Sequence, residues 1–461
     1  MSLEKVLARI DADLDQSLER LFDLMRVKSI SADPAYKADC QAAAEWCSNE
    51  LTGLGFESSV RPTPGHPMVV AHRRDDGATG PNVLFYGHYD VQPVDPIELW
   101  EMDPFDPRIV TRDDGSKMIV GRGSDDDKGQ LLTFVEAARA WIAETGSLPV
   151  PVSILFEGEE ESGSPSLAGF LAENAEELSL DLALVCDTGM WDRNTPAITT
   201  MLRGLMEDEI VITAADRDLH SGSFGSAARN PIHLLASIIA DLHDENGSVA
   251  VPGFYDDVAD LPAEIKAMWD GLGFDEAAFL GQIGLSVPAG EADRSVLEQI
   301  WSRPTCEING IIGGYTGEGF KTVIPSKASA KISCRLVGGQ DPEKVRTAFR
   351  DFVRARMPAD CTVEFLSHGG SPGFTVPIDS PALNQGRAAL DAEWENPAVL
   401  MAMGGSIPIV GDFKHKLGME TLMIGFGLDD DRIHSPNEKY ELKSFHKGIR
   451  SWARVLAELA G

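Results

Sequence analysis

Four short apolar runs, each leading to a polar residue, are the feature of this sequence that most limits its fold. The runs consist mainly of Val, Leu, Ile and Phe, and they lie at 83–86, 150–156, 182–186 and 421–425. Between them, apolar residues recur at the spacing of helices, as they do at 131–142. Repeated strand, turn and helix predict an α/β fold, a mainly parallel sheet with helices on both faces. In such sheets, ligands bind beyond the carboxyl ends of the strands.

Potential metal ligands follow these runs or stand beside them. They are His88, an Asp among 125–127, a Glu among 159–161, Asp187 and His434. Two imidazoles and three carboxylates suit two divalent cations that share one carboxylate, and with a bound hydroxide they cancel the charge of both ions. The residues alone leave open which Asp and which Glu take part. Five such groups at one sheet edge nevertheless favour a metal site over isolated surface residues.

The composition is that of a globular protein with two domains. At 461 residues, the chain exceeds what one hydrophobic core usually holds. It has 40 Lys and Arg against 73 Asp and Glu, a net charge of −33, and no basic run. We therefore expect neither nucleic acid nor an anionic membrane as a partner, and we expect most of the acidic excess to form a solvated surface.

The cysteines and the first residues indicate a cytoplasmic protein. The six cysteines have no Cys-x-x-Cys spacing and are expected to be reduced core residues. The first 25 residues alternate charged and apolar side chains, without the continuous apolar core of an export signal. No stretch reaches the roughly 20 apolar residues that span a bilayer.

The sequence pattern changes at about residue 199 and returns after about residue 382. The intervening part has strand-like segments near 306–312, 328–336 and 361–367, helical patterns at 231–243 and 341–356, and an irregular segment at 251–304. This order of strand-like and helical segments predicts a separate α+β domain. Because His434 lies beyond it, we expect a discontinuous first domain, 1–198 with 383–461, into which 199–382 is inserted.

Seven segments, in order from about residue 80 to the end, resemble signature segments of the di-zinc aminoacylase/carboxypeptidase G metallopeptidase family, and most closely its carnosinase-like dipeptidase branch. They are Gly-His-Tyr-Asp-Val-Gln-Pro, Gly-Arg-Gly-x-x-Asp-x-Lys-Gly, Glu-Glu-Ser-Gly-Ser, Asp-Leu-His-Ser-Gly, Lys-Thr-Val-Ile-Pro, Gly-Gly-Ser-Ile-Pro and His-Ser-x-Asn-Glu. One segment would be weak evidence, but seven in order are specific. The resemblance implies a zinc-exopeptidase-like catalytic domain and makes the inserted domain a lid that also forms dimers.

The resemblance selects residues within the acidic triplets. The family's bridging Asp stands three residues before the Gly, which is Asp126 here, and its Glu pair directly precedes Ser-Gly-Ser. The resemblance therefore makes Glu160 the general base and Glu161 a metal ligand. Asp125 and Glu159 are then bystanders, at positions where the family often has an uncharged residue.

The resemblance implies two divalent metal ions per subunit, zinc first, with manganese or cobalt as alternatives. The implied ligands are His88, Asp126 and Asp187 for one ion, and Asp126, Glu161 and His434 for the other. Asp90 resembles the carboxylate that orients the ring of His88. A cis peptide bond between Asp126 and Asp127 is also implied.

The inserted domain is expected to contact the substrate. His220 resembles the histidine that, in dimeric relatives, reaches into the partner's site and stabilises the tetrahedral oxyanion. A second set resembles the residues that hold the substrate's terminal carboxylate, and Asn230 resembles a lid contact. This carboxylate set is Arg335, Thr322, Gly404, Gly405 and Ser406.

We therefore expect a metal-dependent hydrolase that cleaves the amide bond of a dipeptide or short peptide with a free C-terminal carboxylate. The expected chemistry uses a hydroxide between the metals and Glu160 as the base, in a homodimer formed through the lid domain. An N-acyl-amino-acid deacylase with the same machinery is the alternative. A binding protein without activity is disfavoured, because the base and every ligand are present.

Overall fold

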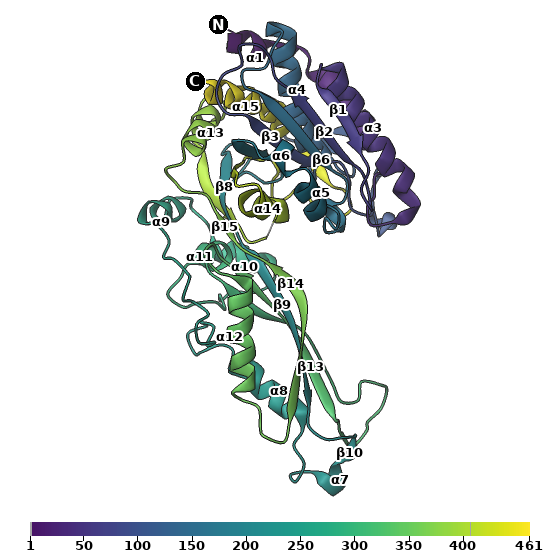
Figure 1. Cartoon of the computed structure of the whole chain (residues 1–461), viewed down its shortest axis with the longest axis vertical. Helices are drawn as coiled ribbons and strands as arrows, with labels where there is room; N and C mark the ends of the chain where they lie inside the picture. The colour runs from purple at the N-terminus through teal and green to yellow at the C-terminus, as the bar shows by residue number, and fades with distance from the viewer. Residues whose placement is uncertain (1, 406) are drawn as a thin grey trace. The chain divides into compact units, whose positions relative to one another are not determined.

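The computed structural model describes residues 2–405 and 407–461, which form two compact units (Figure 1). Unit 1 consists of Met1–Thr200, Val376–Met401 and Asp412–Gly461, and unit 2 consists of Met201–Thr375 and Ala402–Gly411. Three separate stretches of chain therefore build unit 1.

The sequence-based division differs from these units mainly at 402–411. That division assigned 402–411 to the first domain with the rest of 383–461, whereas the structure assigns this stretch to unit 2. There the backbone N–H of Arg203 donates to Gly405 O (3.1 Å), and its Nε donates to Gly404 O (2.9 Å). Hydrogen bonds between residues so far apart in sequence leave no local pattern from which the boundary could be predicted.

The main sheet has nine strands in the order β1-β2-β6-β3-β7-β17-β8-β15, and β16 also pairs with β8. Strand β15 is Phe374–Thr375, and β16 is Val399–Met403. The other strands are β1 (Glu57–Arg61), β2 (Met68–Arg73), β3 (Val83–His88), β6 (Val152–Glu157), β7 (Leu182–Val185), β8 (Ala197–Leu202) and β17 (Glu420–Met423). The four central strands, β6, β3, β7 and β17, are parallel, while β1, β2 and β8 pair in antiparallel fashion. Every residue of β3, β6 and β7 is buried, which explains their continuous apolar sequences. The expected mainly parallel α/β fold is confirmed.

Helices cover both faces of this sheet. They are α1 (Ser2–Ala12), α2 (Leu14–Met25), α3 (Lys37–Gly53), α4 (Lys128–Thr145), α5 (Leu167–Glu173), α6 (Ala175–Leu178), α13 (Pro381–Asp391), α14 (Pro408–Lys416) and α15 (Leu442–Ala460). Neighbouring residues of β3 point to opposite faces. Phe85 stacks on Phe134 of α4 with ring centroids 3.9 Å apart, whereas Tyr86 meets Phe413 of α14 at 6.0 Å.

Two parts of unit 1 differ from the sequence expectations. The predicted opening helix at 4–24 is interrupted at Asp13, between α1 and α2. A small antiparallel sheet of β4 (Arg108–Thr111), β5 (Lys117–Val120) and β18 (Lys439–Glu441) was not predicted. Its strands have only three or four residues, too few to show a clear alternation of apolar and polar side chains.

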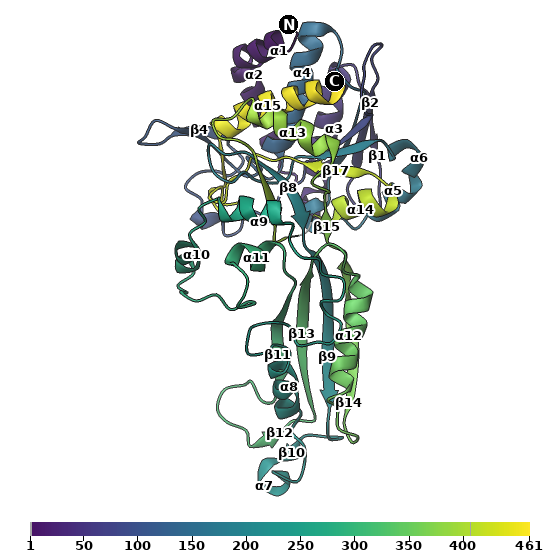
Figure 2. The same cartoon turned by 90° about the vertical axis from the view of Figure 1, so that its left-hand side faces the viewer.

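Unit 2 contains an antiparallel sheet with the order β11-β13-β9-β14 (Figure 2). Its strands are β9 (Gly204–Thr213), β11 (Thr305–Gly313), β13 (Lys327–Leu336) and β14 (Thr362–Ser371). A separate two-stranded sheet pairs β10 (Leu219–His220) with β12 (Val323–Ile324). The helices of unit 2 are α7 (Ser221–Phe224), α8 (Pro231–Ala240), α9 (Ala263–Asp270), α10 (Glu276–Gln282), α11 (Val296–Trp301) and α12 (Pro342–Arg354). Helices α8 and α12 pack on the sheet around one apolar core. The segment expected to be irregular, 251–304, holds α9, α10 and α11.

All six cysteines have free thiols, and five of them are buried. Within the two described ranges, every helix is too short or too polar to span a lipid bilayer.

Candidate metal centre

The chemically important side chains of unit 1 lie where its central strands end. His88 is the last residue of β3, and Glu160 and Glu161 follow β6. Strand β7 ends at Val185, and Asp187 is the second residue after it. The loop after β17 carries His434. Parallel strands end at the same sheet edge, so residues far apart in sequence meet there.

Asp126 reaches this edge from the loop that precedes α4. Gly129, in the first turn of α4, permits the close approach of that loop, because a Cβ atom there would lie 1.8 Å from Ser124 O. The peptide bond between Asp126 and Asp127 is cis, as the resemblance implied. Asp127 Oδ2 accepts a hydrogen bond from the backbone N–H of His88 (3.0 Å).

Two groups of three potential ligands meet at Asp126. One group is His88, Asp126 and Asp187, the other is Asp126, Glu161 and His434, and within each group the potential ligand atoms lie within 4.8 Å of one another. Asp126 Oδ1 lies 3.2 Å from His88 Nε2, and Oδ2 lies 2.9 Å from His434 Nε2. The structure thus brings together all five residues that the resemblance named as ligands, with Asp126 common to both groups.

The electrostatics of these groups fit a cation. His88 is buried, and its Nε2, although 3.2 Å from Asp126 Oδ1, forms no hydrogen bond with any described residue. Burial and the negative charges of Asp126, Glu160 and Glu161 raise the pKa of Asp187 well above its ordinary value, against the opposing effect of His88. Hydrogen bonds with Asp126 and Glu161 raise the pKa of His434 to about 10. Bound divalent ions would replace these protons and relieve the repulsion between the carboxylates.

Asp90 connects the two ligand groups. It is fully buried, and its Oδ1 lies 3.4 Å from His88 Nδ1, on the side of the ring away from Asp126. Its Oδ2 accepts from the backbone N–H of Glu161 (3.1 Å). One carboxylate therefore contacts a member of each group.

Glu160 begins a short 3-10 helix, Glu160–Ser162, directly after the loop that follows β6. Burial raises the pKa of Glu160 to about 7, and the charges of Glu161 and Asp90 add to the shift against the opposing effect of His88. A carboxyl group with a pKa near neutrality can both accept and return a proton.

The neighbours that the resemblance left without a role make other contacts. Glu159 accepts hydrogen bonds from the backbone N–H groups of His66 (2.9 Å) and Ser166 (3.2 Å). Asp125 is buried beside Asp431 and Glu438, whose charges, after burial itself, raise its pKa well above the ordinary value.

The candidate substrate residues of unit 2 form two separate groups. His220 precedes α7, where the N–H of Ser221 donates to Thr322 O (3.1 Å), and Asn230 caps α8 through its side chain. Arg335 lies near the other end of β13. Lys327 and Arg335, near the two ends of β13, are roughly 25 Å apart at the usual rise of a strand. Strands β10 and β12 and helix α7 lie beyond the Lys327 end (Figure 2), so the two groups are at least as far apart. Within one chain, Thr322 is therefore not brought to Arg335, although the resemblance placed both in one set.

Arg203 is a candidate that the sequence analysis missed. It holds Gly404 and Gly405 through the hydrogen bonds described above. Burial lowers its pKa to about 10, and the positive charge of Arg335 adds to this shift. Its only signal in the sequence is a single Arg before a Gly, directly after β8. Such a pair does not distinguish a functional Arg from an ordinary surface Arg. Ser406, predicted in the same loop, lies outside the described residues.

Residues 84–458 match the Peptidase family M20/M25/M40. The chain belongs to this family. Similar M20 peptidases include the Cys-Gly metallodipeptidase dug1 of Schizosaccharomyces pombe, 30% identical over all of this chain and 99% of that protein. The human Beta-Ala-His dipeptidase is 28% identical, over 99% of this chain and 93% of the human protein. These relatives confirm the resemblance to the carnosinase-like branch.

Solved structures of M20 peptidases share the fold. Dug1p of Saccharomyces cerevisiae matches with a TM-score of 0.78 and 27% identity, covering 100% of this chain and 99% of that one. The metallo-carboxypeptidase Sso-CP2 of Sulfolobus solfataricus matches with a TM-score of 0.81 and 29% identity, covering 96% and 99%. The α/β fold of this M20 peptidase is therefore that of known family members.

Proposed function

We propose that this M20 peptidase is a metal-dependent dipeptidase, which hydrolyses the peptide bond of a dipeptide or short peptide with a free C-terminal carboxylate. The observation that carries the proposal is the placement of Asp126, whose two oxygens face His88 and His434. With Asp187 and Glu161, this arrangement supplies two three-ligand sites that share one carboxylate.

Two divalent ions are assigned to these sites, zinc first and manganese or cobalt as the other candidates. Bound there, they would lower the pKa of a water molecule and polarise the scissile carbonyl group. Glu160 takes the proton from the attacking water and passes it to the leaving amine. Asp90 holds the ring of His88 in its ligating orientation.

The names of the relatives support a short peptide as the substrate. One similar protein is named for Cys-Gly and another for Beta-Ala-His. We assign Arg335, with the loop of Gly404, Gly405 and Ser406, to the substrate carboxylate, because a guanidinium group can donate two parallel hydrogen bonds to it. Arg203 holds this loop in place.

We also propose a homodimer formed through unit 2, in which His220, Thr322 and Asn230 serve the site of the partner subunit. Their separation from Arg335 along β13 supports this assignment, since one copy of unit 2 offers two distant groups. Exposed apolar side chains on the edge strand β11 and the loop after it support a contact with a second copy: Ile311 is 59% exposed, Ile312 64% and Phe320 92%.

The function is tested with chelated protein to which zinc, manganese or cobalt is restored. Cys-Gly and Beta-Ala-His should be cleaved only after a metal is added, and their C-terminal amides should be cleaved at least about tenfold more slowly, because Arg335 loses its charged partner. Cleavage of N-acetyl amino acids without cleavage of any dipeptide would contradict the proposal and indicate a deacylase.

The shared site is tested by mixing two inactive variants. If His220 acts in the partner's site, a mixed dimer of His220→Ala and Glu160→Gln subunits has one site with both groups intact. Random mixing makes half of the dimers mixed, so about a quarter of wild-type activity should return, since loss of one oxyanion donor alone costs roughly 100-fold or more. Mass spectrometry checks that subunits exchange. Exchange without recovered activity would rule out the shared site.

A further inference from the structure

A buried carboxylate four residues after His434 holds the loop that leads to Asp126. Glu438 is fully buried, and each of its oxygens accepts two hydrogen bonds. Oε2 accepts from Arg122 Nη1 (2.7 Å) and Gly123 N (3.0 Å). Oε1 accepts from Asp125 N (3.0 Å) and Asp126 N (3.2 Å). All four donors belong to residues 122–126.

Arg122 extends this connection to the loop that follows His88. Its Nη2 donates to Pro93 O (2.9 Å), and its guanidinium carbon lies 5.4 Å from the ring centroid of Trp100. The Arg122 side chain is only 1% exposed. One buried ion pair, Arg122 with Glu438, therefore joins the loop that follows His88 to the loops that carry Asp126 and His434.

The conformation of the loop that carries His434 depends on hydrogen bonds and ion pairs, because the His434 side chain is not fixed by burial. The side chain of His434 is 53% exposed. The loop contains three residues other than glycine with positive φ, Arg432 (58°), His434 (58°) and Asn437 (63°). Positive φ is uncommon for residues other than glycine, although Asn and His adopt it more readily than most, and it persists where surrounding contacts fix it.

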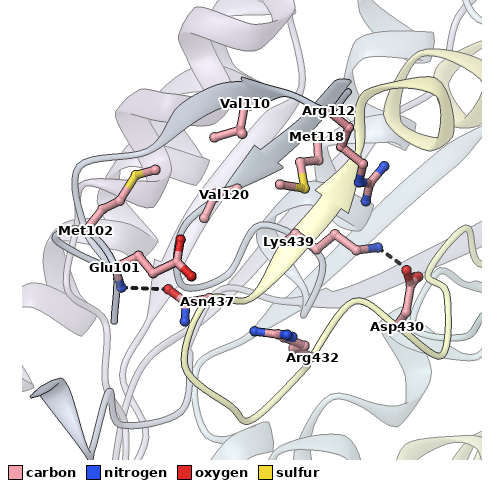
Figure 3. Close-up of a pocket in the computed structure, with 10 residues that line it drawn as sticks. All are labelled: Glu101, Met102, Val110, Arg112, Met118, Val120, Asp430, Arg432, Asn437 and Lys439. Atoms are coloured by element: carbon pink, nitrogen blue, oxygen red, sulfur yellow. Dashed lines mark hydrogen bonds and ion pairs between the residues drawn. The ribbon is translucent and has the colours of Figure 1, made fainter. Parts of the chain in front are cut away.

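Contacts of Asp430 and Asn437, which precede and follow His434 in the sequence, supply this fixation; Figure 3 draws one contact of each. Beside a pocket of about 350 Å³, Asn437 Oδ1 accepts from Glu101 N (2.8 Å). Asn437 Nδ2 donates to Leu99 O (2.9 Å). At the start of the loop, Lys439 Nζ donates to Asp430 Oδ1 (2.8 Å). Glu438 lies between Asn437 and Lys439 in the sequence and is fully buried.

We infer that Glu438 is a positioning residue that, paired with Arg122, sets the spacing of His88, Asp126 and His434 before metal binds. The inference rests on the proposed two-metal site. In the metal-free chain, the carboxylates of Asp126, Asp187 and Glu161 repel one another. The hydrogen bonds of Glu438 oppose this repulsion, so the protein has less rearrangement to complete when the ions enter.

The test is Glu438→Gln, which keeps the size of the side chain. Each carboxylate oxygen faces two donors, whereas an amide offers one oxygen and one NH2 group. In either orientation of the amide, its NH2 group takes the place of one oxygen, so two of the four N–H donors lose their acceptor. Contacts of this kind around metal ligands contribute about 10- to 100-fold to metal affinity. We expect zinc affinity, measured by competition with a chromophoric chelator, to fall by this factor.

Two readouts separate positioning from ligation and from general damage. Saturating metal should restore most of the kcat of Glu438→Gln, and the cobalt absorption spectrum should then approach that of the wild type. Glu393→Gln is the matched control, because Glu393 is also a buried carboxylate in unit 1, with hydrogen bonds from Arg450 Nε (2.7 Å) and Arg454 Nε (2.8 Å). Its metal affinity should equal that of the wild type.

Wild-type zinc affinity in Glu438→Gln, or an equal loss in Glu393→Gln, would overturn the inference. If Glu438→Gln does not fold, as judged by circular dichroism, Arg122→Lys replaces it. Lysine keeps a positive charge beside Glu438 but cannot also reach Pro93 O, so affinity should still fall, and an unchanged value would overturn the inference. The wild-type protein tests the proposed function separately: two bound ions without dipeptide cleavage would reject the substrate and leave the role of Glu438 standing.

Discussion

Glu160→Gln is expected to lower kcat by about 10³-fold or more while both metal sites remain filled. The substitution keeps the shape of the side chain but removes the group that moves the proton, and such groups contribute up to about 10⁴-fold. Glu160 belongs to neither ligand group around Asp126. Steady-state kinetics and elemental analysis of the same sample measure the two effects together.

The neighbouring residue supplies the control for this prediction. Glu159 is also buried and acidic, but its oxygens accept from the backbone N–H groups of His66 and Ser166. Glu159→Gln should therefore retain kcat within a few-fold, even if it lowers the melting temperature. Substantial turnover by Glu160→Gln would remove Glu160 as the base.

We expect the Asp126→Ala variant to bind neither ion and to have no measurable activity. Its Oδ1 and Oδ2 face His88 Nε2 and His434 Nε2, so the substitution takes one ligand from each group. Asp187→Ala and Glu161→Ala should each weaken one site far more than the other, because each belongs to a single group. Metal content measured after gel filtration distinguishes these patterns. One ion retained at full occupancy in Asp126→Ala would contradict the shared carboxylate.

The fold could be predicted where the sequence pattern is local. Runs such as 83–86 are buried on both sides of a parallel sheet, and this requires a continuous apolar sequence. The acidic triplet shows the limit of such reasoning. Asp125, Asp126 and Asp127 are all largely buried, so neither burial nor spacing identifies the ligand. Their partners differ, since Asp127 accepts from the His88 N–H and Asp126 faces both imidazoles.

What could not be predicted depends on contacts between distant residues. Glu438 and Arg122 are 316 positions apart, and no helical or strand period connects them. The separation of Thr322 from Arg335 likewise depends on the length and direction of β13, which a motif does not contain. The resemblance named Thr322 and Arg335 but gave no role to Glu438 or Arg122, and only the fold showed which of these residues meet within one chain.

The position of β17 in the sheet has a consequence for synthesis of the chain on the ribosome. This strand, Glu420–Met423, pairs in parallel with β7, Leu182–Val185, yet all of unit 2's main sheet is translated between them. A nascent chain that has just completed β7 already contains His88, Asp126, Glu161 and, two residues later, Asp187. His434 is translated only after the whole main sheet of unit 2. The first group of potential ligands is therefore complete before the main sheet of unit 2 is made, whereas the second group is complete only after it.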